Sequence, residues 1–222
     1  EPNSKALFLN YPSNPTGASI GKDELLNIAK LADEKNLIVI SDEIYGELSY
    51  EEKHIPFPTL PGMKERTLLL GGFSKAFAMT GWRLGYTASN VAIAKACEKL
   101  QGQFTSATCS ITQKAAVAAL TGDLRPSEEM AEEFTRRREK TLQLVSEVPG
   151  FKCFAPEGAF YVFPDVSYYY GKTDGETVIT GAAEFSMYLL NTAHVSSVMG
   201  DAFGEPNCVR FSFANSMGNI EK

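Results

Sequence analysis

The chain lacks the features that mark several large classes of protein. It has no apolar run near the roughly 20 residues that a membrane-spanning helix needs. Only two histidines are present, and the four cysteines lie far apart without a C-x-x-C spacing, so no metal site is indicated. Basic residues are scattered through a chain of net charge −6, which argues against a nucleic-acid-binding face. We therefore expect a small-molecule partner and no membrane, metal or nucleic acid.

The beginning of the chain has neither the basic stretch nor the apolar core of a secretion signal. With cysteines this sparse, we expect reduced, buried thiols and a cytoplasmic location. An initiator methionine is also missing, and a strand-like apolar run begins already at Ala6. We therefore expect the chain to be part of a longer protein and to lack its N-terminal part.

Short apolar runs alternate with segments of helical periodicity through the first half of the chain. Strands are predicted at 6–10, 37–40, 67–70 and 83–88, and helices around 25–32, 91–100 and 111–120. This alternation is typical of an α/β fold with a mostly parallel sheet covered by helices. We expect residues 1–125 to form part of one large domain.

The pattern changes near Pro126. A long helix is predicted from about 127 to 148, with acidic residues first and basic residues later. This order suits the helix dipole and permits an ion pair between Glu132 and Arg136. Strands at 159–163 and 209–213 then flank a helix at 182–192. We expect residues 126–222 to form this linking helix and a smaller α/β domain.

Lys75 carries the strongest chemical signal. It follows a predicted strand and lies between Phe73 and Ala76, among apolar neighbours that would solvate an ammonium group poorly. Desolvation lowers the pKa of a lysine and favours the neutral amine, which can attack an aldehyde. Nearby, Ser74 and Arg83 supply a hydroxyl and a guanidinium, the groups that a phosphate dianion needs. Taken alone, Lys75 is better explained as a surface lysine whose stem covers apolar neighbours.

Asp42 and Tyr45 follow the strand predicted at 37–40. Open parallel sheets bind ligands beyond the carboxyl ends of their strands, so Asp42 lies where a ligand is expected. A carboxylate there can keep a pyridine nitrogen protonated, and Tyr45 can donate to an oxygen on the same ring. As a single residue, Asp42 is explained about equally well as a helix N-cap.

Asn14 and Arg210 are two further candidates. Asn14 begins a turn-rich segment, Asn14-Pro15-Thr16-Gly17, which composition alone explains as a turn. Arg210 lies in an alternating segment that puts it on the face opposite Val209 and Phe211. An arginine held on a strand can grip a carboxylate through two parallel hydrogen bonds, although a structural ion pair is the competing explanation.

Several separate motifs therefore occur in one order along nearly the whole chain. They are Asn14-Pro15-Thr16-Gly17, Ser41-Asp42-Glu43-Ile44-Tyr45, Ser74-Lys75, Gly81-Trp82-Arg83-Leu84-Gly85 and the late Arg210. Together they resemble the class I/II aminotransferases of the fold-type I pyridoxal-phosphate enzymes, and the bacterial aspartate aminotransferases most closely. The resemblance implies a homodimer that moves an amino group between an amino acid and a 2-oxo acid by a ping-pong reaction.

The resemblance also implies how the cofactor, pyridoxal 5'-phosphate, is held by the large domain at 1–125. Lys75 would bind it as an imine and shuttle the proton of the reaction. Asp42 would pair with the pyridine nitrogen and Tyr45 with the ring oxygen. Ser74 and Arg83 would bind the phosphate.

Substrate binding follows from the same resemblance. Arg210 would bind the α-carboxylate with help from Asn14, which would also contact the ring oxygen. Aspartate is the favoured amino acid, although the region 101–113 contains no arginine that could recognise a second carboxylate.

Family members are nearly twice as long as this chain, so we expect the chain by itself to turn over weakly or not at all. Three alternatives stay open. One is a β-eliminating lyase that uses the same lysine. Another is a serine hydrolase, because Gly72-Phe73-Ser74-Lys75-Ala76 resembles a nucleophile elbow centred on Ser74. The third is a folded piece without catalytic function.

Overall fold

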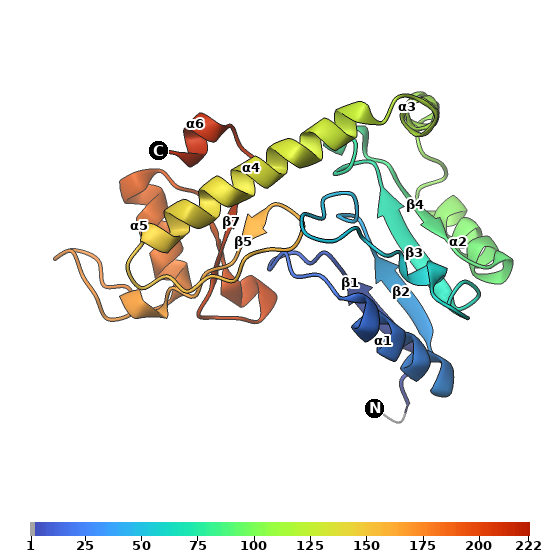
Figure 1. The fold of residues 1–222 in the computed structure, drawn as a ribbon, viewed down its shortest axis with the longest axis horizontal. Helices are drawn as coiled ribbons and strands as arrows, with labels where there is room; N and C mark the ends of the chain where they lie inside the picture. Colours follow the sequence, from blue (N-terminus) through green and yellow to red (C-terminus); the bar gives the residue numbers. More distant parts are fainter. Residues whose placement is uncertain (1–2) are drawn as a thin grey trace. The chain divides into compact units, whose positions relative to one another are not determined.

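The computed structural model describes residues 3–222 (Figure 1). The chain forms two compact units. Unit 1 contains Glu1–Ser13 and Ala18–Ala131, and unit 2 contains Asn14–Gly17 and Glu132–Lys222. The sequence-based division after residue 125 and the structural division after Ala131 both fall within one long helix, α4.

Unit 1 is built from strands and helices that alternate along the chain. Its elements are β1 (Ala6–Asn10), α1 (Lys22–Glu34), β2 (Ile38–Asp42), β3 (Thr67–Gly72), β4 (Gly85–Ala88), α2 (Val91–Phe104), α3 (Ser110–Thr121) and the first part of α4 (Arg125–Glu147), with short 3-10 helices at Phe57–Thr59 and Thr80–Trp82. Each strand and helix that periodicity predicts is present, with ends shifted by a few residues.

The four strands form one sheet in the order β1-β2-β3-β4. The first three run parallel and β4 is antiparallel, which confirms the predicted α/β fold with a mostly parallel sheet. Asp42 is in register with Asn10 on one side and with Leu70 on the other. The carboxyl ends of the parallel strands therefore meet at one edge, where the predicted site residues follow them.

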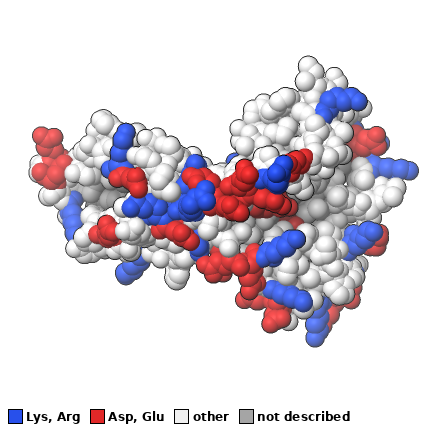
Figure 2. All heavy atoms as spheres, turned by 45° about the horizontal axis from the view of Figure 1, so that its top comes forward, with Lys and Arg blue, Asp and Glu red and all other residues white. Residues whose placement is uncertain are grey.

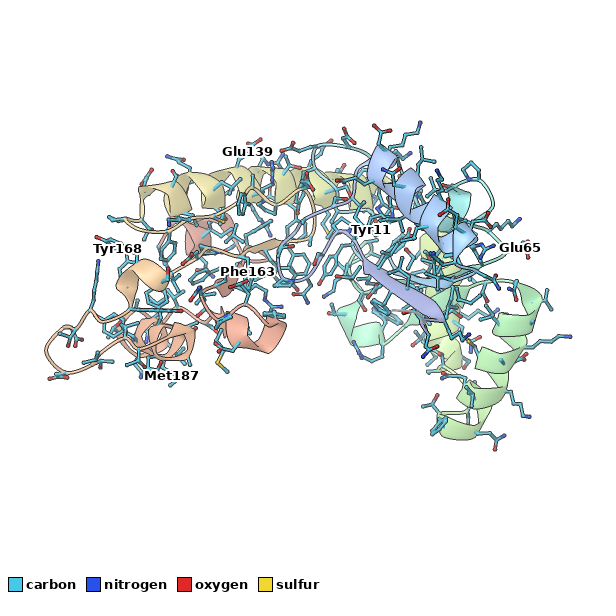
Figure 3. All side chains as sticks on the ribbon, turned by 90° about the horizontal axis from the view of Figure 1, so that it is seen from below. Tyr11, Glu65, Glu139, Phe163, Tyr168 and Met187 are labelled. Atoms are coloured by element: carbon cyan, nitrogen blue, oxygen red, sulfur yellow. The ribbon has the colours of Figure 1, made fainter. Side chains whose placement is uncertain are left out.

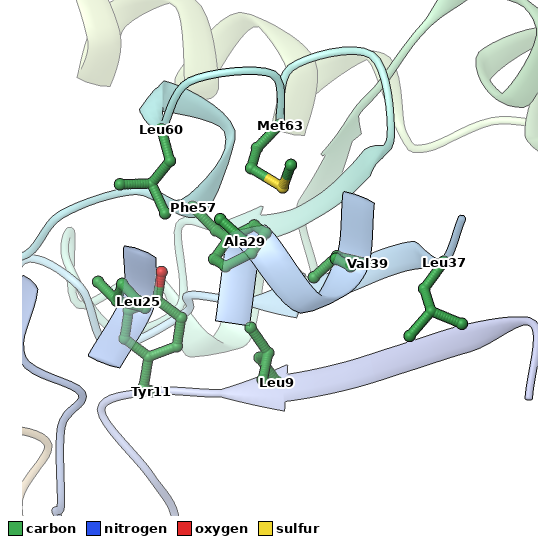
Figure 4. Packing of buried hydrophobic residues seen from close by; sticks show 10 residues of the cluster. Leu9, Tyr11, Leu25, Ala29, Leu37, Val39, Phe57, Leu60 and Met63 are labelled. Atoms are coloured by element: carbon green, nitrogen blue, oxygen red, sulfur yellow. The ribbon is translucent and has the colours of Figure 1, made fainter. Parts of the chain in front are cut away.

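Helix α1 covers the sheet with an apolar stripe. Leu25, Ala29 and Ala32, spaced by four and three residues, are buried and share one core cluster with Leu9 and Val39 of the strands. Figure 4 shows this cluster, to which the 57–63 segment adds Phe57, Leu60 and Met63. Strand β3 is buried only at Thr67, and its other residues are half-buried.

Helices α2 and α3 leave much of their apolar surface exposed. Helix α2 buries none of its side chains, and α3 buries only Thr112. Large exposed apolar side chains on these helices are Val91, Leu100, Phe104, Ile111, Val117 and Leu120. The periodicity thus predicts the helices correctly, but within residues 3–222 most of these side chains do not pack into a core.

Unit 2 combines a small antiparallel sheet with helices. Its elements are the rest of α4, β5 (Tyr161–Val162), α5 (Ala182–Ala193), β6 (Val198–Met199), β7 (Val209–Ser212) and α6 (Met217–Ile220), with 3-10 helices at Ser167–Tyr169 and Gly200–Phe203. The strand order is β5-β7-β6. The strand expected at 159–163 is shortened to two residues, and β6 and α6 were not predicted. Figure 3 shows the side chains of unit 2, including Phe163, Tyr168 and Met187.

The charges of α4 are distributed as predicted, but their partners differ. The expected pair of Glu132 with Arg136 is wrong, because Arg136 donates to Glu133 at 2.7 Å and Arg137 donates to the same carboxylate at 2.9 Å. These hydrogen bonds hold the pKa of Glu133 below its ordinary value, and the bonds from Arg136 have the larger effect. Arg138 is buried, and its Nε donates to the carbonyl of Pro156 at 2.6 Å.

The four thiols are unpaired, as expected, but they are not buried. Cys109 is exposed, and Cys97, Cys153 and Cys208 are half-buried. No helix among residues 3–222 has both the length and the apolar character to cross a bilayer. On the face shown in Figure 2, acidic and basic side chains are interspersed.

Candidate active site

Asp42 ends β2 and its carboxylate shapes the turn that follows. Its Oδ1 accepts a hydrogen bond from the backbone N–H of Ile44 at 3.2 Å. Residues 44–47 form a turn and no helix begins here, so the explanation of Asp42 as a helix N-cap is wrong. The half-buried carboxylate instead caps a turn at the carboxyl end of the strand, and this turn carries Tyr45.

Lys75 lies beside Tyr45. The Nζ atom of Lys75 is 5.5 Å from the centroid of the Tyr45 ring, and that ring is buried, with 4% of its surface exposed. Lys75 itself is half-buried in the loop after β3. On this loop Phe73 and Ala76 are buried, as the apolar sequence around the lysine suggested, whereas Ala78 is exposed. The amine is therefore partly shielded from water and directed toward a phenol.

Ser74 and Arg83 lie on the two segments that meet at the end of β3. Gly72 of β3 is in register with Gly85 of β4, and the N–H of Phe73 donates to the carbonyl of Leu84 at 3.3 Å. A Cβ on Gly72 would lie 3.2 Å from the Cα of Gly85, so the close approach of the segments favours glycine. Ser74 and Arg83 are each two residues from this glycine pair.

Arg83 has a left-handed backbone, with φ of 52°, at the end of the 3-10 helix Thr80–Trp82. Its side chain is exposed, and one Nη donates to the carbonyl of Thr80 at 2.9 Å. The guanidinium has five N–H donors in all, so further donors remain for a ligand such as a phosphate.

A cavity of about 390 Å³ adjoins these loops. Its lining includes Ile44 and Gly46, which flank Tyr45, and Gly72 and Ala76, which flank Ser74 and Lys75. The wall also contains Glu43, His54, Tyr86 and residues of α3 and α4. The cavity thus adjoins the loops that carry Tyr45 and Lys75, although its lining includes none of the predicted cofactor residues themselves.

Asn14 and Arg210 are brought together in unit 2. The Nη1 atom of Arg210 donates to the side-chain oxygen of Asn14 at 2.6 Å, although 196 positions separate them. The guanidinium carbon also lies 4.4 Å from the ring centroid of Tyr161 and 5.1 Å from that of Phe203. Within residues 3–222 no carboxylate forms an ion pair with Arg210, which counts against a purely structural ion pair.

The predicted alternation of β7 is confirmed. Val209 and Phe213 are buried, and Phe211 packs against the core of unit 2, so Arg210 lies on the other face. The segment 14–17 is anchored at Gly17, whose carbonyl accepts the N–H groups of Glu157 and Gly158 at 2.8 Å each. The Asn14 segment is therefore a turn with a fixed place in unit 2.

Some residues of the site were not predicted. Tyr161 and Phe203 hold the Arg210 guanidinium, and Glu43, His54 and Tyr11 form a buried network behind the Asp42 turn. The only sequence signal for the network was the position of Glu43 inside the motif Ser41-Asp42-Glu43-Ile44-Tyr45. These contacts join residues far apart in the chain, which local patterns do not reveal.

All 222 residues, 1–222, match a family model described as aminotransferase class I and II. A bifunctional aspartate aminotransferase and glutamate/aspartate-prephenate aminotransferase of Petunia hybrida is 46% identical over 226 residues, which cover 98% of this chain and 47% of the relative. An aspartate aminotransferase of Pinus pinaster is 46% identical over 233 residues, with 99% of this chain and 47% of the relative covered.

Solved structures agree with this result. The aspartate aminotransferase from Rhizobium meliloti matches with a TM-score of 0.93 and 36% identity over 100% of this chain and 56% of that chain. An aromatic aminotransferase from Pyrococcus horikoshii matches with a TM-score of 0.91 and 37% identity, over 100% and 58%. The chain spans about half the length of these relatives. With its whole length matched in both sequence and fold, this chain belongs to the class I and II aminotransferases.

Proposed function

We propose that the protein carrying this chain is a pyridoxal-phosphate-dependent aminotransferase that moves an amino group between an amino acid and a 2-oxo acid. The observation that carries the proposal is the partly shielded amine of Lys75, 5.5 Å from the Tyr45 ring at the carboxyl ends of β2 and β3. Membership of the family supports it. Aspartate is the favoured amino acid, because relatives from Petunia hybrida and Pinus pinaster are named as aspartate aminotransferases.

The residues of unit 1 have the chemistry that this cofactor requires. When bound, pyridoxal phosphate supplies an electron sink that stabilises negative charge on the substrate Cα. Lys75 offers an amine for its aldehyde, and Asp42 a carboxylate that keeps its ring nitrogen protonated. Tyr45 offers a phenol for the ring oxygen. Ser74 and Arg83 provide a hydroxyl and a guanidinium for the phosphate, from two segments joined by the Phe73–Leu84 bond.

Proton transfer falls to Lys75 in this proposal. Its amine, when free, would take a proton from the substrate Cα and hold it for return to the amino-group acceptor. The ring of Tyr45, 5.5 Å from the amine, would help to keep Lys75 in place while the proton moves. A half-buried position excludes part of the water that would compete for this proton.

Substrate orientation falls to Arg210 and Asn14. The bond from Arg210 to Asn14 and the flanking rings of Tyr161 and Phe203 hold the guanidinium in one orientation before a substrate arrives. Such a fixed, planar donor pair suits an α-carboxylate. Asn14 would also contact the ring oxygen. We further propose a cytoplasmic homodimer whose sites lie at the subunit boundary, as the resemblance to this family implies.

Absorbance spectroscopy of the cofactor-treated protein tests the proposal. We expect a visible or near-ultraviolet band of protein-bound cofactor that is lost in Lys75→Ala and retained in Lys140→Ala, a lysine of α4 outside the site. Production of a new amino acid from a 2-oxo acid would support amino transfer. Release of pyruvate and ammonia would instead indicate a β-eliminating lyase, and labelling of Ser74 by a fluorophosphonate would indicate a hydrolase.

A further inference from the structure

We propose that Glu43 and His54 form a buried pair that positions the turn carrying Asp42 and Tyr45. Both are positioning residues, because they act through the turn and do not touch the reacting atoms. The inference rests on the proposed function, since Asp42 and Tyr45 matter as cofactor ligands only if that function is correct. It concerns a part of the motif to which the resemblance assigns no role.

Glu43 lies between the two proposed cofactor ligands in the sequence, and its side chain is only 6% exposed. One carboxylate oxygen accepts hydrogen bonds from the Ser41 hydroxyl at 2.8 Å and the Phe57 N–H at 2.9 Å. The Tyr11 hydroxyl lies 3.5 Å from the same oxygen and also donates to the carbonyl of Ile55 at 3.0 Å. The other oxygen is 2.6 Å from Nε2 of His54. A buried carboxylate with this many donors is held in one position.

The backbone of Glu43 connects this fixed carboxylate to the turn. The N–H of Glu43 donates to the carbonyl of Leu70 at 3.0 Å, and its carbonyl accepts from Gly46 at 2.9 Å. The backbone of Glu43 is therefore fixed to β3 on one side and to the far end of the turn on the other. A rotation of Glu43 would move its chain neighbour Asp42 and, through the turn, Tyr45.

His54 contacts the same turn from behind. Its side chain is 9% exposed, and its ring packs 4.9 Å from that of Tyr11. A Cβ on Gly46 would lie 2.8 Å from Cδ2 of His54, so the ring rests against the turn backbone. Burial, followed by the charge of Glu43, raises the pKa of Tyr11 far above its ordinary value, so its hydroxyl keeps its proton. Figure 3 marks Tyr11 just beyond β1.

The two ring nitrogens of His54 differ in their hydrogen bonding. Nε2 contacts Glu43, whereas Nδ1 is buried and has no hydrogen-bond partner among residues 3–222. Only Nε2 is therefore needed for the contact. The amide nitrogen of glutamine lies about as far from the backbone as Nε2 of histidine. The amide nitrogen of asparagine lies only about as far as Nδ1. His54→Gln should thus preserve the contact with Glu43, and His54→Asn should lose it.

The two substitutions provide a matched test in the full protein that carries this chain. Met63→Ala serves as a third variant, because Met63 is buried in the core cluster that also holds Tyr11 and Phe57 and is not one of the residues that hydrogen-bond to the Glu43 carboxylate. Three quantities are measured for each variant. They are the dissociation constant of pyridoxal phosphate, the pH midpoint of the absorbance change of the bound cofactor, and the midpoint of urea unfolding.

We expect His54→Asn to weaken cofactor binding about tenfold, as is typical when a residue that orients a ligand is lost. The pH midpoint should also move by more than about half a unit, because the position of Asp42 and Tyr45 sets the cofactor's protonation. His54→Gln should stay close to the wild type in both. Met63→Ala should lower the urea midpoint with little change in either cofactor measurement.

The inference is overturned if His54→Asn leaves affinity and pH midpoint unchanged, or if it changes them no more than Met63→Ala at equal loss of stability. It is also overturned if His54→Gln changes the cofactor affinity and the pH midpoint as much as His54→Asn does. A wild-type protein without an absorbance band that depends on Lys75 would refute the proposed function, and the positioning role with it. A wild-type band that His54→Asn does not alter would refute the positioning role alone.

Discussion

The conservative substitution Arg210→Lys should strongly impair the use of amino acids. The guanidinium of Arg210 is fixed by its 2.6 Å bond to Asn14 and by the rings of Tyr161 and Phe203, so it can present two parallel donors to a carboxylate. Lysine retains the charge but offers a single point donor without the planar fork. Loss of one charge-assisted hydrogen bond costs about 1.5–3 kcal/mol, which lowers kcat/KM about 10-fold to 160-fold.

The assay is kcat/KM for an amino acid donor, measured with the protein that carries this chain. Arg136→Lys is the matched control, because Arg136 is an exposed arginine paired with Glu133, and an exposed ion pair contributes little. An amine with the same side chain but no α-carboxylate is the matched substrate. Its kcat/KM should be the same in the wild type and in Arg210→Lys. The reasoning is refuted if Arg210→Lys keeps the wild-type kcat/KM, or if it impairs the amine as much as the amino acid.

Three further predictions concern stability and thiol chemistry. Gly17→Ala should destabilise the protein by at least about 2 kcal/mol in urea unfolding, because φ is 71° and a Cβ would lie 2.3 Å from that of Pro156. Gly102→Ala, in the last turn of α2 with open space around the position, should instead stabilise it by up to about 0.5–1 kcal/mol; equal effects at the two glycines would contradict both. Burial, with the charge of Glu205 second, raises the pKa of Cys208 to about 11. Its alkylation rate, followed by peptide mass, should therefore keep rising to about pH 11, and a plateau near pH 8.5, typical of an unperturbed thiol, would contradict this.

The fold could be predicted from the sequence to the extent that it depends on local patterns. The helical spacing of Leu25, Ala29 and Ala32 and the apolar runs of β1 to β3 gave the right elements, because each buries one stripe or face. The two-residue strand β6 is too short for periodicity to reveal, and β5 was predicted at 159–163 but is only two residues long. The exposed apolar faces of α2 and α3 were also unpredictable, since periodicity shows which side chains are apolar and not what covers them.

The candidate site was predicted at the level of motifs but not of contacts. Asp42, Tyr45 and Lys75 were predicted because each was expected beyond the end of a strand in a recognisable pattern, and Asp42 is in fact the last residue of β2. That Asn14 is a partner of Arg210 follows only from the fold, because 196 positions separate them. In α4, spacing allowed several partners for Arg136, and side-chain geometry selected Glu133 over Glu132.

Mapping the lysine that bonds to the cofactor tests the central claim most directly. The protein is loaded with pyridoxal phosphate, treated with borohydride to make the bond between lysine and cofactor permanent, and digested for mass spectrometry. We expect one dominant phosphopyridoxyl adduct, on the peptide that contains Lys75. A dominant adduct on another lysine, or no adduct above the level of a sample without borohydride, would contradict it.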